Sequence, residues 1–247
     1  MKKFSILHLY YDIANLSGDS GNILAIRKAF EDQGVEYKLD NKTLGDRIDF
    51  KKYDLVYIGH MNYEVQELVR DDILQYKKDL LSRIEDGMFV IATGNSYELF
   101  GKTINGKKAL NLFNYEATKV TEIISDEELQ NEERLVSEAV CHMKDEDIDY
   151  PIVGFYNHGN EIDNKENVLF NVDKGFGGTS KIHTEGVHKY HFYGTYLLGP
   201  LLVRNPYLLD NIMEKLLTDN KIKFEPKDSL DKIAYREYLR NFKINIK

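Results

Sequence analysis

The fold is decided by residues 88–101, which have the sequence Met-Phe-Val-Ile-Ala-Thr-Gly-Asn-Ser-Tyr-Glu-Leu-Phe-Gly. The first five residues form a continuous apolar run, which is typical of a strand buried on both faces of a parallel sheet. Small residues follow at once and predict that the strand turns abruptly into a helix. This is the geometry of a nucleophile elbow, in which the residue at the turn projects into a site and the helix N-terminus favours an anion.

Strand-like and helix-like segments alternate on the N-terminal side of this elbow. Strands are predicted at residues 4–10, 35–39 and 55–58, and amphipathic helices at residues 23–34 and 65–87. Such alternation predicts a parallel sheet with right-handed crossovers. We therefore predict an α/β fold of the flavodoxin-like kind, an open parallel sheet with helices on both faces. Ligands bind such sheets beyond the carboxyl ends of the strands, which are here residues 10–22, 59–63 and 93–96.

The pattern weakens after the elbow. Residues 126–147 are acidic and helix-prone, and we expect a solvated surface face or a mobile excursion there. Strand signals return at residues 152–155 and 168–170, and a docked helix is predicted at residues 207–217. Since the chain shows no internal repeat and no flexible linker, we predict one domain over residues 1–220, with residues 221–247 as its C-terminal helical extension.

Composition limits the classes of function. The chain has 247 residues, of which 42% are apolar, so it can bury a substantial core. Its 33 basic and 41 acidic side chains give a net charge of -8, which argues against nucleic acid as the main partner. No apolar run approaches the roughly 18–20 residues that span a bilayer, and the N-terminus does not resemble a signal peptide. We therefore expect a cytoplasmic protein without a membrane segment.

The elbow lacks an obvious nucleophile. Gly94 occupies the tip, where serine or cysteine is expected, and glycine cannot attack a carbonyl group. Ser96 lies two residues further into the predicted helix, where N-terminal capping is the more ordinary role.

Other reactive side chains are few. Cys141 is the single cysteine, which excludes an internal disulfide and a zinc site built from several thiolates. It lies within residues 126–147, beside their acidic clusters, and we expect a surface or half-buried thiol. The clustered histidines His183, His188 and His191 fit no helical pair of metal ligands, so no metal site is predicted.

Four stretches of the chain match a known family in the family's order. They are residues 7–22, 94–101, 152–159 and 194–206, which resemble the family's Tyr-Gly-Asp-Arg-Gly-Asn, Cys-Gly-Gly-Tyr-Gln-Leu-Leu-Gly, Gly-Phe-Glu-Asn-His-Gly and Gly-Thr-Tyr-Leu-His-Gly-Pro-Leu-Leu segments. The family is the class I glutamine amidotransferase domain of the cobyric acid synthase (CobB/CobQ) type. Within it, the sequence is most similar to the glutaminase subunits of lipid II isoglutaminyl synthases.

The resemblance implies that the chain keeps the family's fold but lacks its catalytic residues. Such enzymes hydrolyse glutamine through a cysteine thiolate activated by histidine, with backbone N–H groups stabilising the oxyanion. In this sequence the family's cysteine falls on Gly94 and its histidine on Leu198. The family's Gly-Gly-Gly-Gln-Asp loop falls on residues 59–63, and the glutamine of its cysteine motif falls on Glu98. We therefore expect a pseudo-amidotransferase that has lost glutaminase activity, with no intact catalytic residue.

The same alignment defines an expected pocket. Its residues are Gly59, His60, Met61, Asn62, Gly94, Asn95, Ser96, Tyr97, Glu98 and His158. We expect His60 to fill the emptied pocket rather than to act as a general base, and His158 to make structural hydrogen bonds. In the loop before the first helix, Asp19 and Asn22 are expected to cap.

Three functional hypotheses follow. The first is a silent binding or regulatory subunit, for which the resemblance implies a Mur-ligase-like synthetase as partner and glutamine or a related small molecule as ligand. The second is an enzyme of altered chemistry, or with residual amidotransferase or hydrolase activity, in the same pocket. The third is an ordinary amidotransferase whose nucleophile lies elsewhere, which the absence of a cysteine near the elbow disfavours. No cofactor is predicted. The basic and aromatic residues of 221–247 are interpreted as a peripheral docked helix rather than a nucleic-acid site.

Overall fold

The computed structural model describes residues 2–120, 134–144 and 150–245. Its centre is a six-stranded sheet with the strand order β13-β14-β4-β3-β1-β2. The strands are β1 (Phe4–Leu9), β2 (Tyr37–Lys42), β3 (Leu55–Ile58), β4 (Phe89–Thr93), β13 (Val187–Lys189) and β14 (Phe192–Thr195). All neighbours are parallel except the β13–β14 hairpin. Every residue of β3 and β4 is buried, as their continuous apolar sequences predict.

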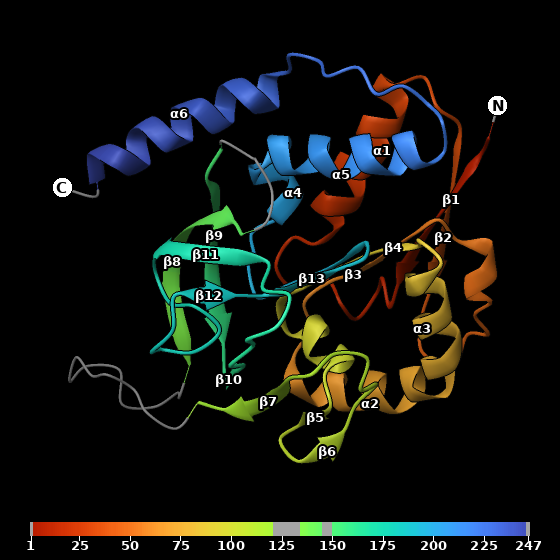
Figure 1. The fold of residues 1–247 in the computed structure, drawn as a ribbon, viewed down its shortest axis with the longest axis vertical. Coiled ribbons are helices and arrows are strands. Elements are labelled where there is room, and N and C mark those ends of the chain that lie inside the picture. The colour runs from red at the N-terminus through yellow and green to blue at the C-terminus, as the bar shows by residue number, and fades with distance from the viewer. Residues whose placement is uncertain (1, 121–133, 145–149, 246–247) are drawn as a thin grey trace.

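Helices cover both faces of this sheet (Figure 1). On one face lie α1 (Ser20–Asp32), α4 (Leu201–Arg204) and α5 (Pro206–Asp219), and on the other lie α2 (Tyr63–Ile73) and α3 (Lys77–Glu85). The predicted open α/β sheet of the flavodoxin-like kind is therefore confirmed. Ile23, Ile26 and Phe30 form the buried stripe of α1. None of the helices in the described ranges has the length and apolarity needed to cross a bilayer.

The predicted helix over residues 65–87 is divided in the structure. A short 3₁₀ turn, Leu74–Tyr76, separates α2 from α3. The hydroxyl group of Tyr76 anchors this turn, because it accepts a hydrogen bond from Ile48 N (3.3 Å) and donates one to Asp46 O (3.1 Å). The apolar periodicity continues through the break, which explains why the sequence predicts a single helix.

Two small sheets lie beside the main one. One has the order β10-β7-β5-β6, and the other β12-β11-β8-β9. Their strands are β5 (Thr103–Ile104), β6 (Lys107–Lys108), β7 (Glu116–Lys119), β8 (Leu135–Met143), β9 (Ile152–His158), β10 (Asn160–Glu161), β11 (Phe170–Lys174) and β12 (Thr184–Glu185).

Strand β8 corrects the interpretation of the acidic segment. Residues 126–147 were expected to be a helix-prone surface face or excursion, yet Leu135–Met143 is a strand whose alternate residues are buried. The acidic clusters flank this strand rather than occupy it, so they conceal its alternation. Residues 126–133 and 145–147 of the segment lie outside the described residues. Cys141 is fully buried on β8 rather than at the surface, and burial raises the pKa of its thiol.

The C-terminal residues form α6 (Leu230–Asn245), which packs against α5 (Figure 1). Tyr235 is buried and donates its hydroxyl hydrogen to Pro151 O. Lys232 forms an ion pair with Asp210 of α5, with 2.7 Å between Nζ and Oδ2. Tyr235 and Lys232 of this stretch thus contact the rest of the chain.

Candidate functional site

The elbow after β4 is present in the structure. Gly94 has a φ of +64°, a backbone conformation that favours glycine, and it turns the chain directly out of the strand. The following residues, Gly94–Phe100, form a 3₁₀ helix rather than the expected α-helix, and all are buried. Side chains satisfy the first carbonyl groups, because Gln66 Nε2 donates to Asn95 O (2.7 Å) and Ser96 Oγ to Thr93 O (2.8 Å).

The space above the tip of the elbow is filled by His60. A Cβ atom at Gly94 would lie 2.7 Å from His60 Cβ and 2.8 Å from its Cγ and Cδ2 atoms. The imidazole is held by a 2.8 Å hydrogen bond between Nδ1 and Ser17 Oγ. Burial lowers the pKa of His60, so the ring favours its neutral form. The tip of the elbow therefore carries no reactive side-chain atom and is closed by a neighbouring side chain.

The loop that follows β3 packs against the elbow. Gly59 has no room for a side chain, because a Cβ atom there would lie 2.2 Å from Ala14 O. The backbone N–H of Met61 donates to Asn95 Oδ1 (3.1 Å), so it is occupied within the protein. Asn62 is the N-cap of α2, where its Oδ1 accepts from Val65 N (2.9 Å).

The other expected site residues serve the core. Ser96 is buried, and its Oγ also lies 3.0 Å from Ile58 O, so the hydroxyl group faces backbone carbonyls rather than a base. Tyr97 packs edge-on against Tyr196, with 4.6 Å between ring centroids. Leu198 is buried, and its N–H donates to Phe155 O (3.0 Å). An aliphatic side chain at this position cannot accept a proton.

Asp19 and Asn22 do not cap α1, which corrects the expectation from sequence. Asp19 is the N-cap residue, but no side-chain capping bond forms. Its Oδ1 instead accepts from Tyr57 Oη (2.8 Å) and Thr93 Oγ1 (3.0 Å). Asn22 donates to Tyr57 Oη (2.7 Å) and accepts from Leu202 N (2.7 Å). These hydrogen bonds join α1 to the ends of β3 and β4. The two side chains satisfy buried polar groups there and so do not cap the helix.

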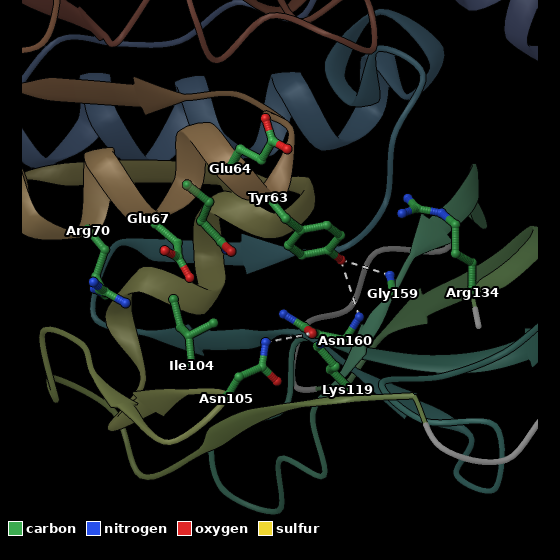
Figure 2. Close-up of a pocket in the computed structure, with 11 residues that line it drawn as sticks. Tyr63, Glu64, Glu67, Arg70, Ile104, Asn105, Lys119, Arg134, Gly159 and Asn160 are labelled. Atoms are coloured by element: carbon green, nitrogen blue, oxygen red, sulfur yellow. Dashed lines mark hydrogen bonds between the residues drawn. The ribbon is translucent and has the colours of Figure 1, made fainter. Parts of the chain in front are cut away.

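An open pocket of about 680 Å³ lies next to the elbow (Figure 2). The residues that line it are Tyr63, Glu64, Gln66, Glu67, Arg70, Ile104, Asn105, Lys119, Arg134, Gly159 and Asn160. Tyr63 Oη accepts hydrogen bonds from the backbone nitrogens of Gly159 (2.7 Å) and Asn160 (3.2 Å), which closes one side of the pocket (Figure 2). None of the ten residues expected from the sequence lines this pocket directly. Glu98 and His158 lie immediately behind its wall.

Glu98 is fully buried behind the pocket. Its Oε2 accepts from Gln66 Nε2 (2.9 Å) and Asn160 Nδ2 (2.7 Å), and its Oε1 accepts from Tyr196 Oη (3.0 Å). Burial raises the pKa of Glu98 to about 7, although these three hydrogen bonds act in the opposite direction. Glu98 is therefore poised to change protonation state near neutral pH.

His158 completes this layer. Its ring stacks on Tyr196, with 3.9 Å between centroids, and its Nδ1 lies 2.5 Å from Asn160 O. Burial lowers the pKa of His158 to about 4, so the ring is neutral near pH 7. His158 thus supports the wall of the pocket in the neutral form.

Residues 5–206 match the CobB/CobQ-like glutamine amidotransferase domain. The chain belongs to this family. It is 28% identical over 228 residues to the GatD subunit of the glutamine-hydrolysing lipid II isoglutaminyl synthase of Staphylococcus aureus, covering 92% of this chain and 90% of that protein. It is 27% identical over 213 residues to the same subunit of Streptococcus pneumoniae, covering 83% and 77%.

Solved structures share the fold of this CobB/CobQ-like domain. A glutamine amidotransferase from Thermotoga maritima superposes with a TM-score of 0.50 at 12% identity, covering 99% of this chain and 94% of that one. At this identity the likeness concerns the fold. It agrees with the flavodoxin-like sheet predicted from the sequence.

Sequence reasoning missed most of the open pocket of this CobB/CobQ-like domain. Asn105, Lys119 and Arg134 come from the region in which the pattern weakens, and no motif points to them. Tyr63 and Gly159 are the lining residues that carried a signal, since they lie in residues 59–63 and 152–159, which were compared with family segments.

No metal centre is visible in the part of the chain that the structure describes. No three histidine, cysteine, aspartate or glutamate side chains there converge on one point. Two of the clustered histidines make other contacts: His188 Nδ1 lies 3.1 Å from Phe192 O, and His191 Nε2 lies 3.0 Å from Asp219 Oδ2.

Proposed function

We propose that this chain is a catalytically silent member of the CobB/CobQ-like amidotransferase family, retained as a binding or regulatory subunit. The observation that carries the proposal is the closed elbow. Gly94 offers no nucleophile, and the imidazole of His60 occupies the space that a side chain at this position needs.

At each position that the covalent route to glutamine hydrolysis needs, this chain has a group that cannot perform the required role. Nucleophilic catalysis requires an activated nucleophile, a base and donors for the oxyanion. Leu198, at the position of the family's histidine, is aliphatic and buried. The Met61 N–H, in the loop aligned with the family's glycine-rich loop, is already bonded to Asn95. Three independent changes favour a lasting loss of activity over a single substitution.

The relatives suggest what such a subunit binds. Both are named as subunits of a glutamine-hydrolysing lipid II isoglutaminyl synthase. By analogy, the proposal includes a Mur-ligase-like synthetase as the partner of this chain. The open pocket is the proposed site for glutamine or a related small molecule, and the ten residues expected from sequence support its wall and the elbow beside it.

The test is release of glutamate and ammonia from glutamine by the purified protein, alone and with a Mur-ligase-like synthetase. We expect no release above the rate without protein. A Cys141→Ala variant is the matched control, because Cys141 is the chain's single thiol. Release that disappears in this variant would show that the nucleophile was assigned to the wrong position. Release that persists would contradict the silent-subunit proposal.

A second candidate is an enzyme of altered chemistry in the open pocket. It is favoured by Glu98, whose raised pKa of about 7 suits a general acid or base. Turnover of a small molecule that is lost in Glu98→Gln, while the fold is retained, would favour this candidate.

A further inference from the structure

At the floor of the open pocket, hydrogen bonds fix the orientation of two side-chain amides, those of Gln66 and Asn160. Gln66 uses both hydrogens of its amide nitrogen inside the protein, toward Asn95 O (2.7 Å) and Glu98 Oε2 (2.9 Å). Both neighbours are acceptors, so the amide cannot be reversed without placing two oxygens against two oxygens. Because Gln66 lines the pocket, its carbonyl oxygen Oε1 is the atom left to face a ligand.

Asn160 is oriented by the same carboxylate. Its Nδ2 donates to Glu98 Oε2 (2.7 Å), which leaves Oδ1 on the side of the pocket. That oxygen accepts one hydrogen bond, from Asn105 Nδ2 (3.1 Å), and retains a second lone pair (Figure 2). Glu98 therefore turns two amide side chains so that their acceptors line the floor.

The buried carboxylate lacks a positive partner. Within the described residues no lysine, arginine or histidine nitrogen forms an ion pair with Glu98. The nearby cation is Arg134, which lowers the pKa of Glu98 only as the smallest of several effects. Its guanidinium is directed at Asn157, to which it donates two hydrogen bonds of 2.6 and 2.9 Å. A buried carboxylate without a counter-ion is costly unless it is protonated or a cation approaches.

We propose that the pocket binds a ligand with a protonated amino group, which contacts the side-chain carbonyl oxygens of Gln66 and Asn160. When this ligand binds, Glu98 behind the two amides releases its proton to the solvent. The inference rests on the proposed function, since it places a small-molecule ligand in the same pocket. Glu98 acts through Gln66 and Asn160 and is therefore a positioning residue.

The coupling follows from charge. A cation at the pocket floor favours the ionised form of Glu98, so binding lowers the pKa of this group from about 7. The other titratable groups that face Glu98 are four tyrosines and one histidine: Tyr63 of α2, Tyr97 of the elbow, Tyr115, Tyr196 and His158 of β9. Burial raises the pKa of the tyrosines and lowers that of the histidine, so all five groups stay neutral near pH 7. Glu185 lies on the far side of Tyr196, to whose N–H it is bonded.

The test compares L-glutamine with glutaramate, which is the same molecule without the amino group. By calorimetry at pH 7 we expect glutamine to bind about tenfold more tightly or better, because a hydrogen bond to a charged group is lost with glutaramate. In buffers of different ionisation enthalpy, glutamine binding should release about half a proton, since Glu98 with a pKa of about 7 is half protonated there. Glutaramate should release none.

Two variants separate the coupling from a structural effect. Glu98→Gln keeps an acceptor for both amides and should bind glutamine without proton release. Glu185→Gln is the matched control, because Glu185 is a second buried carboxyl with a pKa raised to about 7 that bonds Thr195 and Tyr196 rather than Gln66 and Asn160. It should release protons as the unmodified protein does. Equal affinity for the two probes, binding of neither, or proton release that survives Glu98→Gln would overturn the inference.

A ligand-free measurement completes the test. The side-chain amide resonances of Gln66 and Asn160 should shift between pH 6 and 8 in the unmodified protein and remain constant in Glu98→Gln, as expected if Glu98 titrates near pH 7. Constant resonances in both proteins would contradict the role of Glu98. Assay of glutamate in the same samples keeps this outcome separate from the proposed function, which fails only if glutamine is hydrolysed.

Discussion

At the residue scale, the contact between Gly94 and His60 governs the elbow. We predict that Gly94→Cys alone restores no glutaminase activity and destabilises the fold by about 1–3 kcal/mol, because its Cβ atom would lie 2.7 Å from His60 at a φ of +64°. Thermal unfolding and glutamate release measure the two effects.

The matched variant combines three changes, Gly94→Cys, His60→Gly and Leu198→His. It removes the obstructing ring and supplies a thiol with a base, so we expect measurable glutamate release. Stability should not recover, because His60→Gly leaves a cavity and Leu198→His places a polar ring at a buried position. Gly94→Ala, which adds the Cβ atom without a thiol, should be destabilised without gaining activity. Activity in the single Gly94→Cys variant would show that His60 moves aside freely.

Single positions could be predicted from the sequence only where a motif marked them. The motif resemblance alone predicts glycine and leucine at the positions of the family's cysteine and histidine. The sequence suggests that His60 fills the emptied pocket. It does not predict that the ring lies directly over Gly94, because this depends on how the loop after β3 packs on the loop after β4. Asp19 illustrates the same limit: its local sequence favours a cap, but the buried hydroxyl groups of Tyr57 and Thr93 engage it instead.

At the scale of elements, the start of α2 connects the loop after β3 to the pocket. We predict that Asn62→Ala lowers the free energy of unfolding by about 1 kcal/mol, because Val65 N loses its capping acceptor. Chemical denaturation measures the loss. Asn41→Ala on the exposed edge of β2 is the control and should change the stability by less than about 0.5 kcal/mol. An equal effect of both substitutions would show that the cap contributes nothing specific.

The same scale explains which elements the sequence predicts. Long apolar strands and amphipathic helices of the main sheet have enough residues to show a period. Strands such as β5, β6, β10 and β12 have two residues each, which is too short for any alternation to be recognised. Several residues of the open pocket lie in or directly after such strands, for example Asn105 after β5 and Asn160 in β10. Sequence periodicity therefore does not predict the pocket.

At the scale of the whole molecule, four buried groups with large pKa shifts contribute to the response of stability to pH within the described residues. Burial raises the pKa of Glu98 and Glu185 from 4.5 to about 7, and lowers that of His8 and His158 from 6.5 to about 4. Between about pH 4.5 and 6.5 the folded state holds more protons than the unfolded state on the carboxyls and fewer on the histidines, so the two effects oppose each other. Above pH 6.5 the unfolded-state histidines also become neutral, so their effect fades and that of the carboxyls dominates.

We therefore predict that the protein loses about 1 kcal/mol of stability between pH 6.5 and 8, because the loss from the two carboxyls, which are forced to ionise in the interior, exceeds the gain from the histidines. Glu185→Gln isolates one of them, because glutamine can still accept from Tyr196 N and has no charge to bury. Relative to the unmodified protein, this variant should gain stability as the pH rises from 5 to 8, by about 2 kcal/mol in urea denaturation. A constant difference across this range would mean that Glu185 is ionised in the folded state throughout, and that Thr195 and the Tyr196 N–H outweigh the cost of its burial.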